Sequence, residues 1–272
     1  MTGGHAAHAP AAGAAGRLPE LRAPAAWRAI DFLSDLHLAE STPRTFDALA
    51  AHLRCTDADA VFILGDLFEV WVGDDARHDG FEARCAALLA QASARRFVAF
   101  MAGNRDFLVG DDLLRSSGVA ALADPTVLVA FGQRALLTHG DALCLSDTDY
   151  QAFRARVRGP GWQSEFLAQP LERRRAIAAE IRAESRRRKA GAGPEGGFDV
   201  DEAETGRWME RAGVPWMVHG HTHLPARHPV APGRVRFVLS DWDFDHPAGA
   251  PRGDVLRWQA DGFRRMAPAT AA

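Results

Sequence analysis

Short apolar runs alternate with amphipathic segments along most of the chain from residue 29 onwards. The runs 29–34, 61–64 and 97–101 have the length and the branched or aromatic composition of buried β-strands. Pro43, after a Ser-Thr pair, predicts the start of a helix, and apolar residues at helical spacing predict another helix over 81–94. This alternation of strands and helices predicts α/β layers.

Strands dominate the later part of the pattern. The runs 126–131 and 134–138 are separated by Gly132-Gln133 and predict a hairpin. Further strands are predicted over 215–218, 235–239, 255–258 and 263–266. We therefore expect a mixed sheet rather than a purely parallel one.

The segment from about 149 to 213 interrupts this pattern, because it contains no predicted strand. Helices are predicted over 150–158, 163–169, 171–189 and 201–212, with a flexible glycine-rich loop over 191–197. We interpret the segment as an inserted helical cap over the edge of the sheet, with a peripheral helix pair as the alternative. The first 28 residues, rich in Ala, Gly and Pro, predict a flexible tail and leave one domain over 29–272.

The composition narrows the functional classes. A hydrophobic content of 47% and a charged content of 25% are typical of a soluble globular protein, and a net charge of −3 gives no general reason to bind nucleic acid. Three cysteines without a C-x-x-C pair fit a reducing compartment. No run approaches the roughly 20 apolar residues of a membrane span. We therefore expect a cytoplasmic protein.

Five polar clusters carry the candidate chemistry, and each one comes after an apolar run. Carboxylate, imidazole and amide groups bind divalent ions such as Mn²⁺. Because the ends of neighbouring strands can converge at one edge of a sheet, the clusters predict a two-metal site, with Asp66 as the bridging carboxylate. One aspartate after a strand is more often a turn or cap residue, but five such clusters are difficult to explain separately. The clusters are Asp35-Leu36-His37, Gly65-Asp66, Gly103-Asn104-Arg105-Asp106, His139-Gly140-Asp141 and His219-Gly220-His221-Thr222-His223.

The order D-x-H, G-D, G-N-x-[DE], H-G and G-H-x-H, over about 29–266, resembles that of the calcineurin-like metallophosphoesterases. The resemblance implies a metallophosphoesterase domain built as a layered α-β-β-α sandwich with the helical cap inserted. The blocks 65–75, 103–108, 139–144 and 150–154 are similar to the UDP-2,3-diacylglucosamine diphosphatase family. That family hydrolyses the pyrophosphate of UDP-2,3-diacylglucosamine to UMP and 2,3-diacylglucosamine 1-phosphate in lipid A synthesis.

The same resemblance implies two Mn²⁺ ions and a catalytic set. One ion is implied to be bound by Asp35, His37, Asp66 and His223, and the other by Asp66, Asn104, His139 and His221. The implied catalytic residues are Asp66, Asn104, Arg105 and His139, with a metal-activated hydroxide that attacks the uridine-side phosphorus. Arg105 is permanently charged and a poor general acid, which suits a sugar-phosphate leaving group better than an alkoxide.

Substrate contacts are implied for a further set of side chains. They are Asn104, Arg105, Asp147, Tyr150, Arg182, Ser185 and His221, together with Lys189, placed in a loop, in place of a lysine expected near Ala192. A helix cap at Asp147 and a surface position for Ser185 are the alternatives. Leu224 stands where the family often has arginine.

The implied partner is a lipid-linked UDP-sugar, which a soluble enzyme must meet at a bilayer. The cap is predicted to carry an apolar stripe of Phe166, Leu167, Leu171, Ile177 and Ile181, flanked by Arg173–Arg175 and Arg186–Lys189. Such a segment can bind the anionic cytoplasmic face of the inner membrane peripherally, and a solvated face over an ordinary helical core is the alternative. We expect a monomer and no nucleic-acid partner.

Two other functions stay open at this point. One is a calcineurin-like phosphoesterase that acts on soluble nucleotides or phosphodiesters, and the other is a metal-stabilised interaction protein without activity. A nuclease is disfavoured, because the chain lacks net positive charge and an interleaved aromatic platform.

Overall fold

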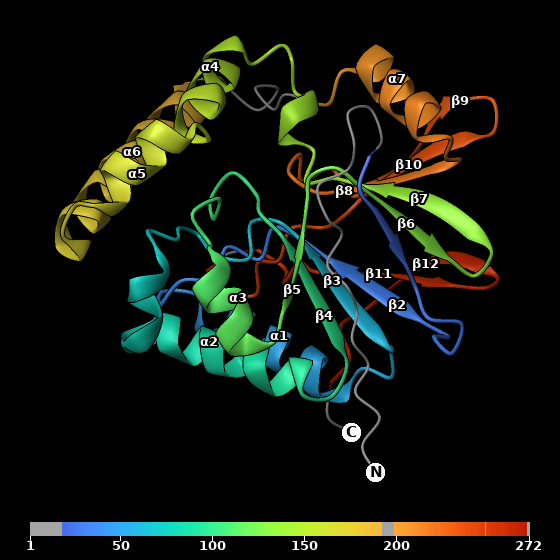
Figure 1. The fold of residues 1–272 in the computed structure, drawn as a ribbon, viewed down its shortest axis with the longest axis horizontal. Helices are drawn as coiled ribbons and strands as arrows, with labels where there is room; N and C mark the ends of the chain where they lie inside the picture. The colour runs from blue at the N-terminus through green and yellow to red at the C-terminus, as the bar shows by residue number, and fades with distance from the viewer. Residues whose placement is uncertain (1–17, 192–198, 248, 271–272) are drawn as a thin grey trace.

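The computed structural model describes residues 18–191, 199–247 and 249–270. Its strands form two six-stranded sheets, of order β12-β11-β2-β3-β4-β5 and β1-β6-β7-β8-β10-β9, that lie face to face (Figure 1). The strands of the first sheet are β2 (Ile30–Leu33), β3 (Ala60–Leu64), β4 (Phe97–Met101), β5 (Ala120–Leu122), β11 (Val255–Gln259) and β12 (Gly262–Met266). Those of the second are β1 (Glu20–Arg22), β6 (Thr126–Ala130), β7 (Gln133–Leu137), β8 (Trp216–His219), β9 (Ala226–Ala231) and β10 (Arg234–Val238).

Both faces of the first sheet are covered, which explains its continuous apolar runs. Every residue of β2 and β3 is buried. Phe32 packs in one cluster with Leu137 of the second sheet, whereas Leu33 packs in another with Leu49 and Leu89 of the outer helices. Alternate residues of one strand therefore fill two separate cores.

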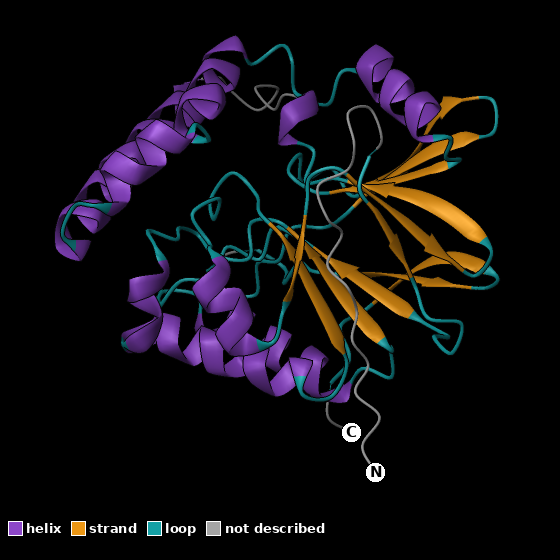
Figure 2. Ribbon diagram, in the orientation of Figure 1, coloured by secondary structure: helices purple, strands orange, loops and turns teal. Residues whose placement is uncertain are grey.

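Helices form the two outer layers (Figure 2). α1 (Pro43–Cys55), α2 (Gly80–Ser93) and α3 (Asp111–Ser117) lie on the first sheet, and α7 (Glu202–Ala212) lies on the second. Two short 3₁₀ helices are η1 (Asp74–His78) and η2 (Asp141–Leu143). The predicted layered α-β-β-α sandwich with a mixed sheet is confirmed.

The inserted segment is shorter than predicted. α4 (Thr148–Val157), α5 (Pro160–Leu167) and α6 (Leu171–Gly191) stand together apart from the outer layers (Figure 1). By contrast, Met209 of α7 packs with Leu136 and Met217 of the second sheet, so the cap prediction over 149–213 is wrong for this helix. Polar exposed faces made α7 resemble the cap helices in sequence. We call α4, α5 and α6 the cap.

Two further sequence predictions need correction. The tail prediction through residue 28 is wrong for β1, which pairs in parallel with β6 at the edge of the second sheet; residues 1–17 lie outside the described residues. A three-residue strand is too short to give a periodic signal. Lys189 was predicted in a loop, but α6 continues to Gly191. Of the predicted loop over 191–197, residues 192–197 lie outside the described residues.

The hairpin prediction is confirmed with its turn shifted by one residue. β6 and β7 pair antiparallel, and the two residues between them are Phe131 and Gly132. Both have positive φ, 55° and 73°, as the tight turns of twisted hairpins require. Among the described residues, no helix is long and apolar enough to cross a bilayer.

Candidate metal centre and active site

The five polar clusters meet at one edge of the two sheets. Asp35, Asp66 and Asn104 follow β2, β3 and β4, which are parallel neighbours. His139 and His221 follow β7 and β8, which are also parallel. Because the carboxyl ends of parallel strands lie at the same edge, the topology brings all seven predicted ligands together. The seven are Asp35, His37, Asp66, Asn104, His139, His221 and His223.

One group of ligand atoms is formed by Asp35, His37 and His223, which lie within 4.8 Å of one another. His223 Nε2 lies 3.3 Å from Asp35 Oδ1 and 3.3 Å from His37 Nε2. Asp35 Oδ1 is buried and has no hydrogen bond within the described part of the chain. A buried carboxylate oxygen that faces two imidazole nitrogens fits a divalent cation.

A second group surrounds Asn104. Its amide oxygen lies 3.0 Å from His139 Nε2 and 3.0 Å from His221 Nδ1, and the Asp66 carboxylate is equally near. The outer nitrogen of His139, Nδ1, lies 2.9 Å from the Leu64 carbonyl oxygen, which makes Nδ1 the donor and leaves Nε2 for a ligand. Two imidazoles, a carboxylate and an amide that converge in this way form a donor set that divalent ions bind, so this group also fits a metal.

Asp35 connects the two groups, because its carboxylate also lies within 4.8 Å of ligand atoms of Asp66 and His139. Asp66, the predicted bridge, is therefore not the only carboxylate at the centre. Its Oδ1 lies 3.6 Å from His139 Nε2 and accepts the Arg105 backbone N–H at 2.8 Å. The role of Asp66 as the bridging ligand stays a prediction.

The backbone at these residues is strained. Asp35, His37, Asp66, His221 and His223 all have positive φ, between 48° and 67°. Each non-glycine residue in this region costs about 1–3 kcal/mol, and such strain persists mainly where function and surrounding contacts hold it. Five of the seven predicted ligands share it, which supports a functional centre independently of their chemistry.

Two glycines allow the loops to approach this closely. A Cβ on Gly103 would overlap the Asp66 carboxylate, and a Cβ on Gly220 would overlap Asp35 and Ser34. Beside Gly220, Asp35 Oδ2 accepts hydrogen bonds from Ser34 Oγ at 2.6 Å and from the His221 N–H at 2.9 Å. The glycines of the clusters are therefore packing requirements as well as turn residues.

Histidine side chains neutralise part of the negative charge of the carboxylates at the centre. Burial disfavours the charged form of Asp35, but His223, with help from His139, holds the pKa of this carboxyl well below its usual range. Burial also opposes protonation of His139, yet the Asp66 and Asp35 carboxylates raise its pKa to about 9. Burial lowers the pKa of His221 to about 3, and the neighbouring His139 acts in the same direction. The excess of negative charge at the centre therefore favours a bound cation and, without one, increases the affinity of His139 for a proton.

Sequence reasoning gave no role to several residues that support the centre. Asp106 is fully buried and accepts backbone N–H groups from Gly103 at 2.8 Å and Leu67 at 2.7 Å, joining two ligand loops. Glu69 and Asp241 lie behind His37 and His223, with carboxylate oxygens 3.3 Å and 3.7 Å from the outer ring nitrogens. Asp106 sits inside a recognised cluster, but only the fold reveals Glu69 and Asp241.

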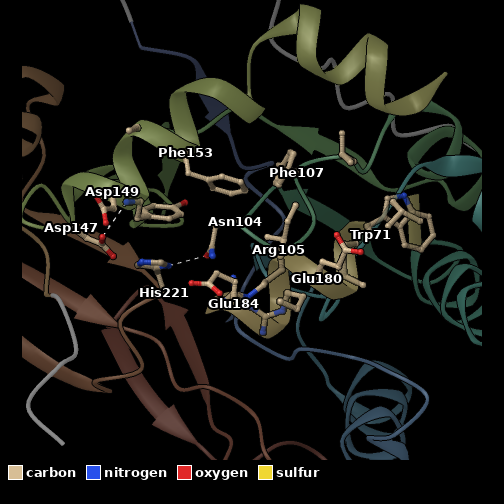
Figure 3. A pocket seen from close by; sticks show the side chains of 18 of the residues that line it. Trp71, Asn104, Arg105, Phe107, Asp147, Asp149, Phe153, Glu180, Glu184 and His221 are labelled. Carbon is tan, nitrogen blue, oxygen red and sulfur yellow. Dashed lines mark hydrogen bonds between the residues drawn. The ribbon is translucent and has the colours of Figure 1, made fainter. Parts of the chain in front are cut away.

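A cavity of about 1040 Å³ opens beside the centre, between it and the cap (Figure 3). Its polar end contains Asn104, Arg105 and His221, and its walls are largely apolar, with Glu180 and Glu184 also among the lining residues. The buried Arg105 Nε has no hydrogen-bond partner within the described residues, so it can still bind an anion. The apolar lining comes from Val70, Trp71, Val72, Phe107, Leu108, Phe153, Trp162, Phe166, Ala178 and Ile181.

Six of the eight predicted substrate residues line this cavity, and their contact with substrate stays a prediction. They are Asn104, Arg105, Asp147, Tyr150, Arg182 and His221. Asp147 caps α4 by accepting the Tyr150 N–H at 3.1 Å, as its alternative interpretation predicted. The Tyr150 hydroxyl donates to Asp141, so it is the ring, stacked on His221, that faces the centre. The side chains of Ser185 and Lys189 lie outside the described residues.

The predicted apolar stripe of the cap faces inward rather than toward a membrane. Phe166 is buried, Ile181 lines the cavity, and Leu171 and Ile177 pack on the core. Leu167, 41% exposed, is the exception among the five. The stripe therefore closes the cavity, which an amphipathic pattern alone cannot distinguish from membrane contact.

The Arg173–Arg175 flank is also only partly available to lipid. Arg174 is buried, and its Nη1 donates to Asp75 Oδ1 at 2.9 Å. Arg175 Nη1 lies 3.0 Å from Glu172 Oε1. Arg174 therefore joins the cap to the core, whereas Arg175 remains partly exposed and Arg173 is exposed.

The fold and the ligand geometry define a metallophosphoesterase with a divalent metal centre, and a sequence model of the calcineurin-like phosphoesterase family matches residues 29–225. A protein named UDP-2,3-diacylglucosamine hydrolase from Xanthomonas oryzae pv. oryzae (strain PXO99A) is 45% identical over 242 residues, 85% of this chain and 95% of the relative. One of the same name from Cellvibrio japonicus (strain Ueda107) is 46% identical over 219 residues, 78% of this chain and 90% of the relative. This chain belongs to the calcineurin-like phosphoesterase family, within the group of proteins that carry that name.

Proposed function

We propose that this chain hydrolyses the pyrophosphate bond of UDP-2,3-diacylglucosamine to UMP and 2,3-diacylglucosamine 1-phosphate, a step of lipid A biosynthesis. The observation that carries the proposal is the single cavity that joins the candidate metal centre to an apolar chamber under the cap. A diphosphate with two acyl chains needs both kinds of surface in one site. The names of the relatives identify a substrate of this chemistry.

The proposed metal content is two Mn²⁺ ions, held by the seven ligands described above. When bound, such ions supply Lewis-acid stabilisation and a nucleophilic oxygen at neutral pH. The chain itself contributes the positions of the phosphates. Asn104 and His221 orient the diphosphate at the polar end of the cavity, and the Arg105 guanidinium stabilises charge on the phosphoryl oxygens.

Arg105 does not act as a general acid in this proposal, because a guanidinium stays protonated. The leaving group is a sugar phosphate, whose second pKa of about 6 makes it stable as an anion at neutral pH. No strong proton donor is therefore required at the leaving oxygen. An alkyl monoester would need one, and a permanently protonated guanidinium such as that of Arg105 does not supply it.

The proposal is tested by following UMP release from UDP-2,3-diacylglucosamine in detergent, with the metal-free protein and with added Mn²⁺. We expect Mn²⁺-dependent release that Asp66→Ala abolishes while the circular dichroism spectrum is retained. A water-soluble UDP-sugar serves as the matched substrate. Equal turnover of that substrate would favour the rival function, a phosphoesterase of soluble nucleotides, over the lipid assignment.

A non-catalytic, metal-stabilised interaction protein is the remaining alternative. It predicts no turnover of either substrate by the Mn²⁺-loaded protein, although Mn²⁺ would still raise the thermal stability. The unpartnered Arg105 Nε at the cavity weighs against this alternative, because a structural metal site does not need a free guanidinium beside it.

The proposed location is the cytoplasm, with peripheral binding to the inner membrane. With the apolar stripe turned inward, this proposal depends on the lipid nature of the substrate and on Arg186–Lys189, whose side chains are not all described. Neutralising Arg186–Lys189 should release the protein from vesicles that contain anionic lipid, as measured by sedimentation. Equal sedimentation of the parent and the variant would contradict binding through this segment.

A further inference from the structure

The two histidines of the first ligand group share an arrangement that the sequence did not indicate. The Nε2 atoms of His37 and His223 face each other across 3.3 Å, so their Nδ1 atoms point away from the centre. Behind His37, Nδ1 lies 3.3 Å from Glu69 Oε2. Behind His223, Nδ1 lies 3.7 Å from Asp241 Oδ2. Each ring is therefore backed by a carboxylate.

Each carboxylate is in turn held by an arginine. Arg182 Nε donates to Glu69 Oε1 at 2.9 Å, and Arg182 Nη2 donates to the same oxygen. Arg252 Nη2 donates to Asp241 Oδ2 at 2.8 Å. The two arginines differ in origin, because Arg182 belongs to α6 of the cap, 113 residues from Glu69, whereas Arg252 precedes β11.

The chemistry of a ligand histidine gives this arrangement a function. A neutral imidazole that binds a metal through one nitrogen carries its proton on the other, and a carboxylate there fixes both the tautomer and the ring orientation. The side chains of Arg182, Glu69 and His37 are 14%, 29% and 20% exposed, so these three side chains are largely shielded from water. The Glu69 carboxylate is shielded from water and contacts both His37 and Arg182, which together hold it in one position.

We infer that Glu69 is a positioning residue that presents His37 Nε2 to the metal, and that Arg182 fixes Glu69 from the cap. Docking of the cap is thereby coupled to metal affinity, before any substrate is bound. The inference refines the site of the proposed function but depends only on its metal centre, not on the identity of the substrate.

Arg182 can serve two purposes at once. Its Nε and Nη2 are used by Glu69, while the buried Nη1 has no hydrogen-bond partner among the described residues and the side chain lines the cavity. The predicted contact with substrate therefore has one free donor group available. A substrate contact alone would affect KM, whereas the positioning role affects the metal.

The experiment is Mn²⁺ binding to the metal-free protein, measured by isothermal titration calorimetry without substrate. We expect Glu69→Ala to weaken one of the bound ions by about 10- to 100-fold and to leave the other near its original affinity. Glu69→Gln keeps an oxygen acceptor for His37 Nδ1 and should restore part of the loss. Arg182→Ala should weaken the same ion by a smaller factor.

Arg173→Ala is the matched control, because Arg173 lies on the same helix with its side chain exposed to solvent, away from the contacts that dock the cap. It should bind both ions as the parent protein does. Unchanged Mn²⁺ affinity in a folded Glu69→Ala protein would overturn the inference. If that variant does not fold, unchanged Mn²⁺ affinity in both Glu69→Gln and Arg182→Ala would overturn it. Parent-like metal binding in Arg182→Ala, with a raised KM only, would limit Arg182 to the substrate and overturn the coupling.

Failure of this inference and failure of the proposed function give different results. A parent protein that binds Mn²⁺ but does not release UMP contradicts the substrate assignment and leaves the titration valid. A parent protein that releases UMP, with Glu69→Ala binding metal normally, contradicts the positioning role alone.

Discussion

Replacing Asp106 by asparagine is the sharpest test of how the ligand loops are held, because the change is isosteric. The Asp106 carboxylate accepts four backbone N–H groups. Oδ1 accepts from Gly103 at 2.8 Å and Asp66 at 3.3 Å, and Oδ2 accepts from Leu67 at 2.7 Å and Phe68 at 3.3 Å. In Asp106→Asn, the amide oxygen can keep one pair of donors, but the amide NH₂ must face the other pair.

The cost follows from this count. Each buried donor left without an acceptor costs about 1–3 kcal/mol, so two of them cost roughly 4 kcal/mol. Burial and the Asp66 charge raise the pKa of Asp106 to about 7, while the N–H groups oppose the rise. Measurements at pH 8 therefore compare asparagine with an ionised carboxylate. For a chain of this size, 4 kcal/mol corresponds to a loss of roughly 10 °C in Tm.

The assay is denaturant and thermal unfolding of the metal-free protein, followed by circular dichroism at pH 8. Asp112→Asn is the matched control, because this carboxylate is exposed on α3 and pairs only at the surface, with Arg115; it should change stability by less than about 1 kcal/mol. A loss in Asp106→Asn no larger than in the control would refute the reasoning. It would mean that asparagine satisfies the loop as well as the carboxylate does.

The remaining predictions concern the core, the chemistry and the cavity. Although burial disfavours the charged form of Asp31, hydrogen bonds from His52 and Arg257 hold its pKa at about 2. Arg257→Met should therefore lower the free energy of unfolding at pH 7 by about 3 kcal/mol, as measured by denaturant unfolding. Because this folded pKa lies below the unfolded value of 3.8, the stabilisation is complete above about pH 4 and falls toward pH 2, so an equal deficit at pH 7 and pH 3 would contradict the assignment. Arg105→Gln should lower kcat for UMP release by about 10²- to 10³-fold with the pH profile unshifted, and an unchanged kcat would exclude charge stabilisation by Arg105. Trp162→Ala should raise KM for the diacylated substrate by roughly tenfold and leave a soluble UDP-sugar unaffected; equal effects on both would indicate general damage.

The sequence predicted the strands and the convergence of the polar clusters after them, because both signals are local. A buried strand such as β4 (Phe97–Met101) can be recognised by its apolar composition, and Asn104 follows it three residues later. Parallel pairing then places the ends of β2, β3 and β4 at one edge of the sheet. No further information from the sequence is needed to bring the side chains after them together. Predicting that these side chains converge thus required only the strand ends and the residue types after them, whereas their assignment to metal ions stays a prediction.

Prediction failed where the outcome depends on a partner distant in the chain. Arg174 and Arg173 are adjacent in an arginine run, yet one is buried against Asp75 and the other is exposed. Arg182 pairs with Glu69 across 113 residues. The apolar stripe of the cap is assigned to a membrane through the family resemblance, since a helical pattern alone does not state which surface covers it. Short edge strands such as β1 fail for a different reason, since three residues give no period.

The contacts of the cap arginines give the block after Asp66 a structural role, although it contributes no further predicted metal ligand. Arg182 binds Glu69, and Arg174 Nη1 binds both Asp75 Oδ1 and the Val72 carbonyl oxygen, at 2.9 Å and 2.5 Å. One segment of about ten residues therefore begins with a ligand and continues as the surface on which α6 docks. Displacing the cap would break these contacts with the residues that follow Asp66. The inferred coupling between docking of the cap and metal affinity would therefore act through this stretch of backbone.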